Sequence, residues 1–248
     1  MSTKTILKHA RSLRQKKFRD EHGQFLVQGP KLVGELLHAR WPVEAILATP
    51  EAAQRLGFED ATIVPGHELD RIGTLESGNE VVALAWKPQE RSSLDPGPEG
   101  FVLALDGIAD PGNLGTVIRL ADWFGIGQVW CNTGSVEVYN PKCVQASMGA
   151  IFRVAVEYVD LPRTLADQQA NGAAIYFATM DGRSVFKEHL APKAVLVLGN
   201  ESHGLSPAVL AVGGTRIAIP GKGGAESLNV AMAAAGFCTE FARQRGTA

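Results

Sequence analysis

Six short strand-like runs after residue 100 restrict the fold of this chain more than any other feature. Several of them, such as FVLALDG (101–107) and AVLVLGN (194–200), are apolar throughout instead of alternating with polar residues. Strands that are buried on both faces have this composition, which is typical of a parallel sheet covered by helices on both sides. We therefore predict an α/β fold with a parallel sheet, built from the runs FVLALDG, QVWCN, RVAVEYV, AAIYFAT, AVLVLGN and TRIAIP.

The part of the chain before residue 88 repeats the alternation of strand and helix in shorter units, which predicts a second, small α/β sandwich. It opens with a basic segment that reads as one helix over about residues 3–20. The stretch KPQERSSLDPGPEG, which ends at Gly100, is rich in Pro, Gly, Ser and charge, as linkers are. We place domains at residues 1–87 and 101–248, with a linker at 88–100.

Composition excludes several classes of protein. The net charge of −2 shows that the chain as a whole is not strongly basic, although it permits a local basic face. The three cysteines have no C-x-x-C spacing, which indicates a reducing compartment, and the six histidines form no H-x-x-x-H pair that would suggest a metal site. The N-terminus lacks a long apolar segment, so we expect neither a signal peptide nor a membrane span, and a cytoplasmic location.

Three turns after strands carry polar side chains together with glycine. They are DGIADPGNLGTVIR (106–119), GNESHGLS (199–206) and IPGKGGAESLN (219–229). Ligands of open parallel sheets bind beyond the carboxyl ends of the strands, so we expect the functional site at these turns.

The third turn is not a triphosphate-binding loop, although it has a Gly-Lys-Gly core. That motif places a glycine five residues before the Gly-Lys pair and a Ser or Thr after the lysine. Here the first position is Arg216, and Lys222 is followed by Gly223.

Each polar residue of these turns also has a purely structural interpretation. Asn113 is expected at or near the cap of a helix that carries Arg119 six positions later, and Glu201 suits the first turn of a helix. Ser227 is expected to cap a final helix that extends to about Arg245, with Asn229 in its first turn. A single turn of this kind does not decide between capping and function, but three together favour a site.

The three turns resemble the three signature motifs of the SpoU (TrmH-like) RNA ribose methyltransferases of the SPOUT superfamily. The matching segments are D-P-G-N-L-G-T-V-I-R, L-G-N-E-S-H-G-L-S and I-P-x-x-G-x-x-x-S-L-N-V, and NPKCVQASMGAIFRV also resembles a segment of that family. The resemblance covers about residues 100–245. One departure is Gly221, where the family usually has methionine after Ile-Pro.

The resemblance implies a deep trefoil knot, a homodimer, and transfer of a methyl group from S-adenosylmethionine to a ribose 2′-hydroxyl of RNA. It places backbone contacts to the cofactor at Gly199, Ile219 and Leu228. It places Arg119 at the 2′-hydroxyl, with Asn113 orienting Arg119 or the ribose, Glu201 holding Arg119 or its loop, and Ser227 and Asn229 fixing the third loop.

The opening SLRQKKFRDEHGQFLVQGPKLVGELL resembles, more loosely, the small ribosomal-protein-L30e-like domain with which many of these enzymes hold RNA. Clustered lysine and arginine side chains suit a phosphate backbone. The candidate RNA contacts are Lys8, Arg11, Arg14, Lys16, Lys17 and Arg19.

Ribosomal RNA of the large subunit is the favoured substrate, because an additional N-terminal domain is present. Three alternatives stay open at this point. They are a transfer RNA methyltransferase, an inactive RNA-binding module of the same fold, and an unrelated α/β nucleotide-binding protein. Binding of S-adenosylmethionine in preference to ATP would exclude the last of these.

Overall fold

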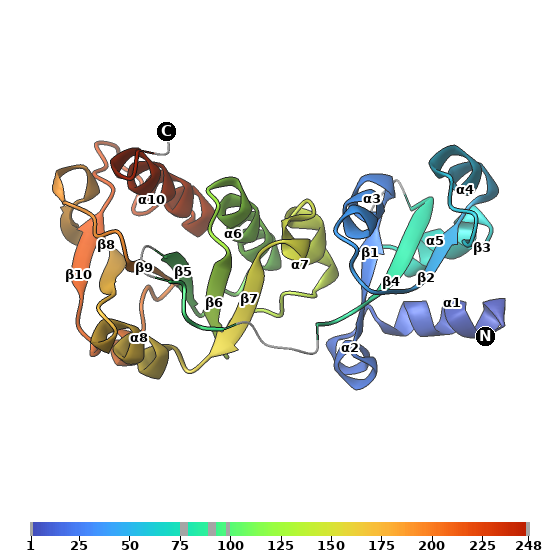
Figure 1. Ribbon diagram of the computed structural model, residues 1–248, viewed down its shortest axis with the longest axis horizontal. Coiled ribbons are helices and arrows are strands. Elements are labelled where there is room, and N and C mark those ends of the chain that lie inside the picture. The colour runs from blue at the N-terminus through green and yellow to red at the C-terminus, as the bar shows by residue number, and fades with distance from the viewer. Residues whose placement is uncertain (1, 75–78, 89–92, 98–99, 247–248) are drawn as a thin grey trace.

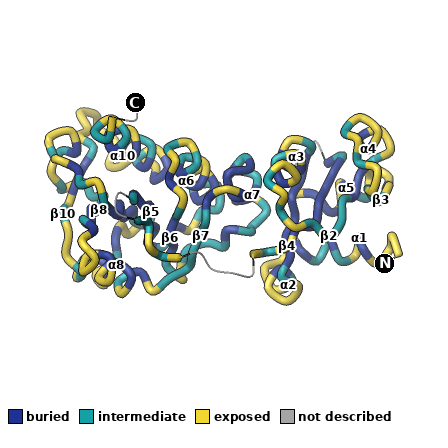
Figure 2. The backbone as a smooth tube through the Cα atoms, viewed as in Figure 1, coloured by how far each residue is buried: buried dark blue, intermediate teal, exposed yellow. Residues whose placement is uncertain are grey.

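The computed structural model describes residues 2–74, 79–88, 93–97 and 100–246. Within them the chain forms two α/β units that lie next to each other along the long axis of the molecule, each around its own sheet (Figure 1). The central strands of both units are largely buried, and the outer helices and loops carry most of the exposed residues (Figure 2). Residues 89–92 and 98–99 of the predicted linker lie outside the described residues.

The N-terminal unit is a four-stranded sheet of order β1-β4-β2-β3 with helices on both faces. Phe25 and Val27 of β1 pack with α3 on one face, whereas Leu26 packs with α1 and α5 on the other. The strands are β1 (Gln24–Gln28), β2 (Val43–Ala48), β3 (Thr62–Ile63) and β4 (Val81–Trp86). The helices are α1 (Thr3–Ser12), α2 (Lys16–His22), α3 (Pro30–His38), α4 (Pro50–Leu56) and α5 (Gly66–Ile72).

The basic segment that was expected as one helix over about residues 3–20 is two helices, α1 and α2. Leu13 is fully buried and ends α1, and Gln15 begins α2 in an extended conformation. The carbonyl oxygens of Leu13 and Arg14 at this break both accept a hydrogen bond from Nη1 of Arg19, at 2.9 and 2.8 Å. A buried arginine thus compensates for the interrupted helix, which the helical pattern of the sequence does not indicate.

The C-terminal unit confirms the prediction of a parallel sheet. Its six strands have the order β10-β8-β9-β5-β6-β7, and every neighbouring pair is parallel. The strands are β5 (Phe101–Asp106), β6 (Gln128–Asn132), β7 (Ala155–Val159), β8 (Ala174–Ser184), β9 (Ala194–Gly199) and β10 (Thr215–Ala218). The helices are α6 (Pro111–Trp123), α7 (Pro141–Ala146), η1 (Ala150–Phe152), α8 (Leu161–Ala170), η2 (Val185–Lys187), α9 (Pro207–Leu210) and α10 (Val230–Gln244).

Helices cover both faces of this sheet, as the uniformly apolar strands predict. Leu103 and Leu105 of β5 belong to the core beneath α6 and α10, whereas Val102 and Ala104 belong to the core beneath α8 and α9. Figure 1 shows α6 and α10 on one side of the sheet and α8 on the other.

Two helical segments of the C-terminal unit end or begin at unexpected places. Within residues 141–152, Met148 and Gly149 adopt positive φ angles of 51° and 95°, which separate α7 from η1. The final helix begins at Val230 instead of Ser227, because residues 219–229 form an extended loop.

Gly115, inside α6, is required by the close contact of α6 with α7. A Cβ atom added there would lie 2.5 Å from the carbonyl oxygen of Cys143 and 2.7 Å from Cβ of Ala146. We expect Gly115→Ala to lower the free energy of unfolding by about 1–3 kcal/mol, because the cost of overpacking exceeds the better helix propensity of alanine.

Gly34→Ala in α3 is the matched control. A Cβ atom at Gly34 meets no neighbour within 4 Å, so this variant should be more stable than the wild type by about 0.5–1 kcal/mol. Urea denaturation measures both changes. A stabilised Gly115→Ala variant would contradict the tight contact between α6 and α7.

Candidate active site

Three loops leave the carboxyl ends of strands β5, β9 and β10. They span residues 107–110, 200–206 and 219–229. Strands β5 and β9 are neighbours in the sheet, but β8 and β9 separate β10 from β5. The third loop therefore has to pass the ends of two strands before it reaches the first.

The side chain of Asn113 on α6 connects these three segments. Its Nδ2 donates a hydrogen bond to Oε1 of Glu201 at 2.7 Å, and its Oδ1 accepts one from Nδ2 of Asn229 at 3.0 Å. Oδ1 of Asn229 in turn accepts from the backbone N–H of Ala231 at 2.9 Å. This series of hydrogen bonds begins at a backbone N–H and ends at a carboxylate. Only one orientation of each side-chain amide therefore pairs every donor with an acceptor.

A second set of polar groups holds the first two loops beneath this cluster. Asp106, only 3% exposed, accepts hydrogen bonds from Nδ2 of Asn132 at 2.7 Å and from the backbone N–H of Ser206 at 2.6 Å. Oδ1 of Asn132 accepts from the N–H of Gly107 at 3.0 Å, and Asn200 donates to the Gly107 carbonyl at 2.6 Å. These bonds compensate for burial of the carboxylate and fix the loops relative to each other.

The fold of the second loop requires a glycine at Gly199, because no side chain fits there. A Cβ atom there would lie 2.3 Å from the carbonyl carbon of Gly204 and 2.6 Å from the backbone nitrogen of Leu205. The loop returns this closely because Asn200 and Gly204 exchange two backbone hydrogen bonds of 2.9 Å. A cofactor contact at the Gly199 backbone stays a prediction.

The helix caps differ from those expected. Asp110 caps α6, since its Oδ1 accepts from the N–H of Asn113 at 2.9 Å. Asn229 caps α10, and Ser227 lies exposed in the preceding loop, so the expected capping role of Ser227 is wrong. With Asp110 as the cap, the Asn113 side chain is free to join the other two loops.

Arg119 lies further along α6, about 9 Å from Asn113 along the helix axis. Its side chain is exposed and forms no hydrogen bond or ion pair with the residues that the structure describes. The carboxylate of Glu201, which was expected to hold Arg119 or the loop, is bonded to Asn113. The Arg119 guanidinium therefore stays available for a group outside the protein.

The third loop offers unpaired backbone groups. Residues 220–228 are all exposed, and no backbone hydrogen bond joins them to another part of the described chain. Added Cβ atoms at Gly221, Gly223 and Gly224 would meet nothing within 4 Å. Leu228 is 53% exposed and Ile219 is half-buried, so the loop offers apolar surface beside free N–H and C=O groups. This combination fits a ligand that has a flat ring and a polar edge.

Lys142 on α7 is a member of the site that the sequence pattern did not indicate. Its Nζ donates to Oδ2 of Asp110 at 2.8 Å. This bond, together with the N–H of Asn113, holds the pKa of Asp110 below its usual value. Asp106 and Asn132 were also missed. Both end apolar strands, and a search for every polar residue at a strand end would have found them.

Other chemistries find little support in the described parts of the chain. Cys131 and Cys238 are buried, which raises the pKa of each thiol to about 12 and keeps it protonated. Among the described residues, no three His, Cys, Asp or Glu side chains are grouped so as to hold a metal ion. None of the described helices is both long and apolar enough to cross a membrane.

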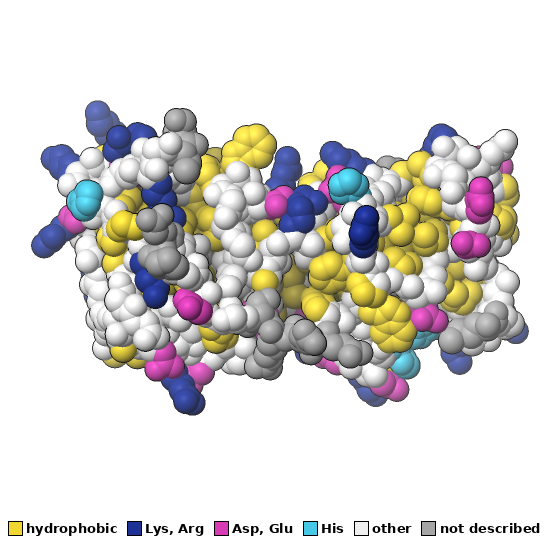
Figure 3. Space-filling view, in the orientation of Figure 1, with side chains coloured by type: hydrophobic (Ala, Val, Ile, Leu, Met, Phe, Trp, Pro, Cys, Tyr) yellow, Lys and Arg dark blue, Asp and Glu magenta, His cyan; other side chains and the backbone are white. Residues whose placement is uncertain are grey.

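The basic residues of the N-terminal unit do not form one uniform surface. Lys8, Arg14, Lys16 and Lys17 are exposed, and Arg11 is partly exposed and paired with Glu68. Arg19 was expected to contact RNA, but its side chain is only 3% exposed and pairs with Glu137, so it cannot reach a phosphate in this arrangement. One face of the molecule shows lysine and arginine side chains dispersed among acidic ones (Figure 3).

Asn229 has two roles that one pair of variants separates. Asn229→Ala removes the helix cap and the bond to Asn113, and should lower the free energy of unfolding by about 1 kcal/mol. Asn229→Asp keeps an oxygen that caps α10, but it removes the donor to Asn113 and sets a carboxylate oxygen against Oδ1 of Asn113, so it should lose less stability than Asn229→Ala without reaching the wild type. Thermal unfolding measures both. Equal losses in the two variants would show that capping is not what Asn229 contributes.

Comparison with known proteins identifies the family. Residues 100–239 match the model of the SpoU rRNA Methylase family, and residues 4–91 match the MRM3-like substrate binding domain. The chain is 29% identical to the 23S rRNA (guanosine(2553)-2′-O)-methyltransferase RlmP of Bacillus subtilis (strain 168), over 92% of each protein. It is 30% identical to the 23S rRNA (uridine(2479)-2′-O)-methyltransferase of Streptomyces viridochromogenes, over 92% of this chain and 85% of that one.

Among solved structures, the SpoU methyltransferase AviRb from Streptomyces viridochromogenes, in complex with the cofactor AdoMet, superposes with a TM-score of 0.87. The superposition covers 100% of this chain and 99% of that one at 27% identity. The family model spans the three loops joined by Asn113, and a relative at 30% identity matches almost the whole chain. The chain therefore belongs to the SpoU rRNA methylase family.

Proposed function

We propose that this protein transfers a methyl group from S-adenosylmethionine to a ribose 2′-hydroxyl of large-subunit ribosomal RNA. Residues 101–248 would carry the reaction and residues 1–87 would hold the RNA. The observation that carries the proposal is the union of three strand-end loops by Asn113, Glu201 and Asn229, beside an arginine with no partner in the described protein. The two curated relatives are named for different nucleotides of 23S rRNA, which supports the class of RNA but not the nucleotide.

Residues of the second and third loops would hold the cofactor. The free backbone groups of residues 220–228 suit the polar edge of an adenine, and the exposed Leu228 and half-buried Ile219 suit its faces. Backbone groups at Gly199, Ile219 and Leu228 are the proposed contacts. When bound, S-adenosylmethionine supplies an activated methyl group on a sulfonium. The protein then has to align the 2′-oxygen with this group and exclude competing water.

Arg119 would bind the reacting nucleotide. A guanidinium stays protonated in proteins and is therefore a poor general base. Its positive charge instead stabilises the alkoxide that develops at the 2′-oxygen and anchors a neighbouring phosphate. The proton would leave to a phosphate oxygen or to water. Asn113, Glu201 and Asn229 would keep the loops in register around this group, and Ser227 would contact the nucleotide from the third loop.

A second copy of the chain is part of the proposal. Trp123 at the end of α6 is 82% exposed, and Met232 on α10 is 65% exposed. Because α6 and α10 pack against each other, these side chains add apolar surface to one face of the C-terminal unit. A homodimer through this face would cover them. The trefoil knot, the L30e-like character of the N-terminal unit and a cytoplasmic location stay predictions.

The test is transfer of a tritiated methyl group from S-adenosylmethionine to total RNA of a strain that lacks this gene. Label in the large-subunit ribosomal RNA, at one position, is the expected result. Label in transfer RNA alone would overturn the assignment of substrate. Cofactor binding without label in any fraction would favour an inactive RNA-binding module.

Arg119→Lys keeps the positive charge but loses the planar fork. We expect it to lower kcat by about 100- to 1,000-fold, because a preorganised donor at the developing charge is lost. Affinity for S-adenosylmethionine, measured by calorimetry, should not change. Normal turnover by Arg119→Lys would exclude the role assigned to this residue.

Removal of exposed basic residues should weaken RNA binding in a salt-dependent way. In the triple variant Lys8→Ala, Arg14→Ala, Lys17→Ala, the slope of log affinity against log salt concentration should fall by about 0.7–0.9 for each phosphate that is no longer neutralised. Arg163→Ala, an exposed residue of α8, is the control and should leave the slope unchanged. Fluorescence anisotropy with an rRNA fragment measures the slope. If the slope of the triple variant equals that of the wild type, the RNA-binding surface lies elsewhere on the protein.

A further inference from the structure

A buried ionic network joins the two units of the chain. Nε and Nη2 of Arg19 both donate to the carboxylate of Glu137, which precedes α7, and the two side chains are only 3% and 11% exposed. Nζ of Lys87, at the end of the N-terminal unit, donates to Oε1 of Glu137 at 3.1 Å and to Asp20 at 2.7 Å. Nη1 of Arg19 thus binds the turn between α1 and α2. Its Nε and Nη2 bind the C-terminal unit through Glu137.

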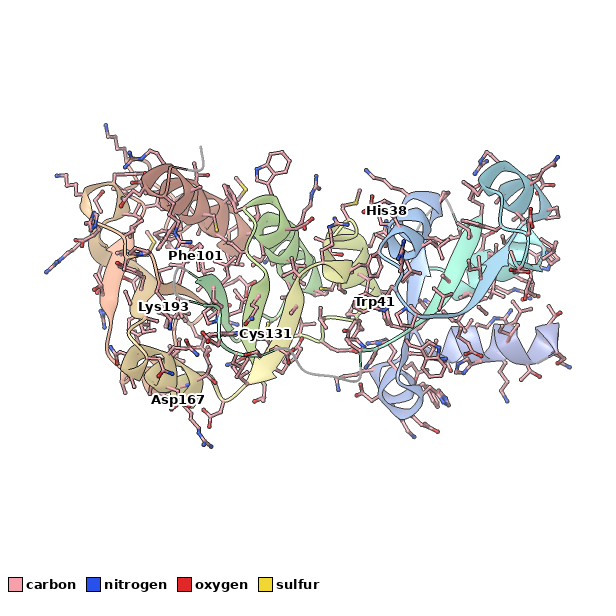
Figure 4. The ribbon with its side chains drawn as sticks, viewed as in Figure 1. His38, Trp41, Phe101, Cys131, Asp167 and Lys193 are labelled. Atoms are coloured by element: carbon pink, nitrogen blue, oxygen red, sulfur yellow. The ribbon has the colours of Figure 1, made fainter. Side chains whose placement is uncertain are left out.

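Contacts between aromatic rings also join the two units. The ring of Phe25 on β1 lies 4.5 Å from that of Tyr139, and the ring of Trp41 lies 5.4 Å from that of Phe152. Figure 4 shows Trp41 on the side of the N-terminal unit that faces α7. Buried residues of both units form one continuous hydrophobic cluster. The described part of the chain therefore has a packed junction, not two units tethered by a linker alone.

The junction leads directly to the candidate active site. Glu137 belongs to the segment 133–140 between β6 and α7. Within that segment, the N–H of Val136 donates to the carbonyl of Ile108, in the first site loop, at 2.8 Å. Asn132, just before the segment, holds the N–H of Gly107. The carboxylate of Glu137, which pairs with Arg19, therefore lies on the segment that supports the first site loop. That loop leads into Asn113.

The arrangement of the two units also occurs in a related structure. A single superposition on the AviRb methyltransferase covers the whole chain with a TM-score of 0.87. Two units that took up different relative positions in the two proteins would not both fit one superposition this well. The two proteins share this relative placement of the units at only 27% identity, which indicates that the junction is retained between distant relatives.

We propose that Arg19 is a positioning residue of the methyltransferase: by locking the N-terminal unit onto the segment 133–140, it fixes the distance between the RNA held by that unit and Arg119. The enzyme then selects, within a structured RNA, the nucleotide that lies at this fixed distance. This proposal rests on the proposed function. It gives Arg19 a role in RNA selection without any contact between Arg19 and RNA, as its burial requires.

Arg19→Met removes the bonds to Glu137 together with the two bonds of Nη1 at the turn between α1 and α2, so it is tested beside a second variant that leaves this turn intact. Arg19→Met keeps much of the side-chain volume, and it leaves Glu137 paired with Lys87, so no buried charge is left alone. Arg153→Gln is a second route to the same effect, because Arg153 bridges Glu35 of α3 and Asp122 of α6. Arg55→Met is the matched control, since it breaks an ion pair with Glu80 that lies wholly inside the N-terminal unit.

Each protein is assayed on two RNAs. One is an rRNA fragment long enough to reach the N-terminal unit, and the other holds only the few nucleotides around the methylated position. Small-angle X-ray scattering records the arrangement of the units. Calorimetry with S-adenosylmethionine and thermal unfolding report whether the fold is kept.

We expect Arg19→Met and Arg153→Gln to increase the maximum dimension in solution and to lower kcat/KM on the long RNA by about 10- to 100-fold, because the target is misplaced. On the short RNA, and in cofactor affinity, both variants should match the wild type, and Arg55→Met should match it throughout. Equal losses on both RNAs, or an unchanged rate on the long RNA with a loosened junction, would overturn the positioning role. If the wild-type protein methylates neither RNA, the proposed function itself fails and this inference fails with it.

Discussion

The hydrogen bonds of Asn113 are the interaction on which the arrangement of the three site loops in the C-terminal unit depends. A parallel sheet brings strand ends to one edge, but it does not bring the loop after β10 to the loop after β5, because two strands lie between them. One amide that donates to Glu201 and accepts from Asn229 closes that gap. The cap by Asp110 and the buried Asp106 beneath the loops hold Asn113 where both bonds form.

This arrangement divides the site into a rigid part and an open part. The first two loops are pinned by Asp106, Asn132 and Asn200 through bonds of 2.6–3.0 Å. Residues 220–228 have no such backbone bonds within the described chain, and Arg119 has no protein partner there. The groups without protein partners lie where a cofactor and a nucleotide are proposed to bind. The first two loops are held in place by the protein, and the third loop and Arg119 face the proposed ligands, as expected for a preorganised site.

Much of this follows from the sequence, because it depends on local pattern. Uniformly apolar strands predicted the covered parallel sheet, and polar residues after strands led to Asn113, Glu201 and Asn229. The errors concern interactions between distant residues. Ser227 and Asn229 are both good helix caps, and only the course of the loop 219–229 decides between them. Arg19 has the composition of an RNA contact, but its burial depends on Glu137, which lies 118 residues away. No periodicity reveals such a pair.

The most direct test of the proposed reaction identifies the atom that is methylated. Large-subunit ribosomal RNA is treated with the purified protein and S-adenosylmethionine, digested to nucleosides and analysed by mass spectrometry. We expect a single new nucleoside whose methyl group lies on the ribose, and an alkali-resistant phosphodiester bond at the same position. A methyl group on a base would contradict the role of Arg119 and the assignment of the three joined loops to ribose 2′-O-methylation.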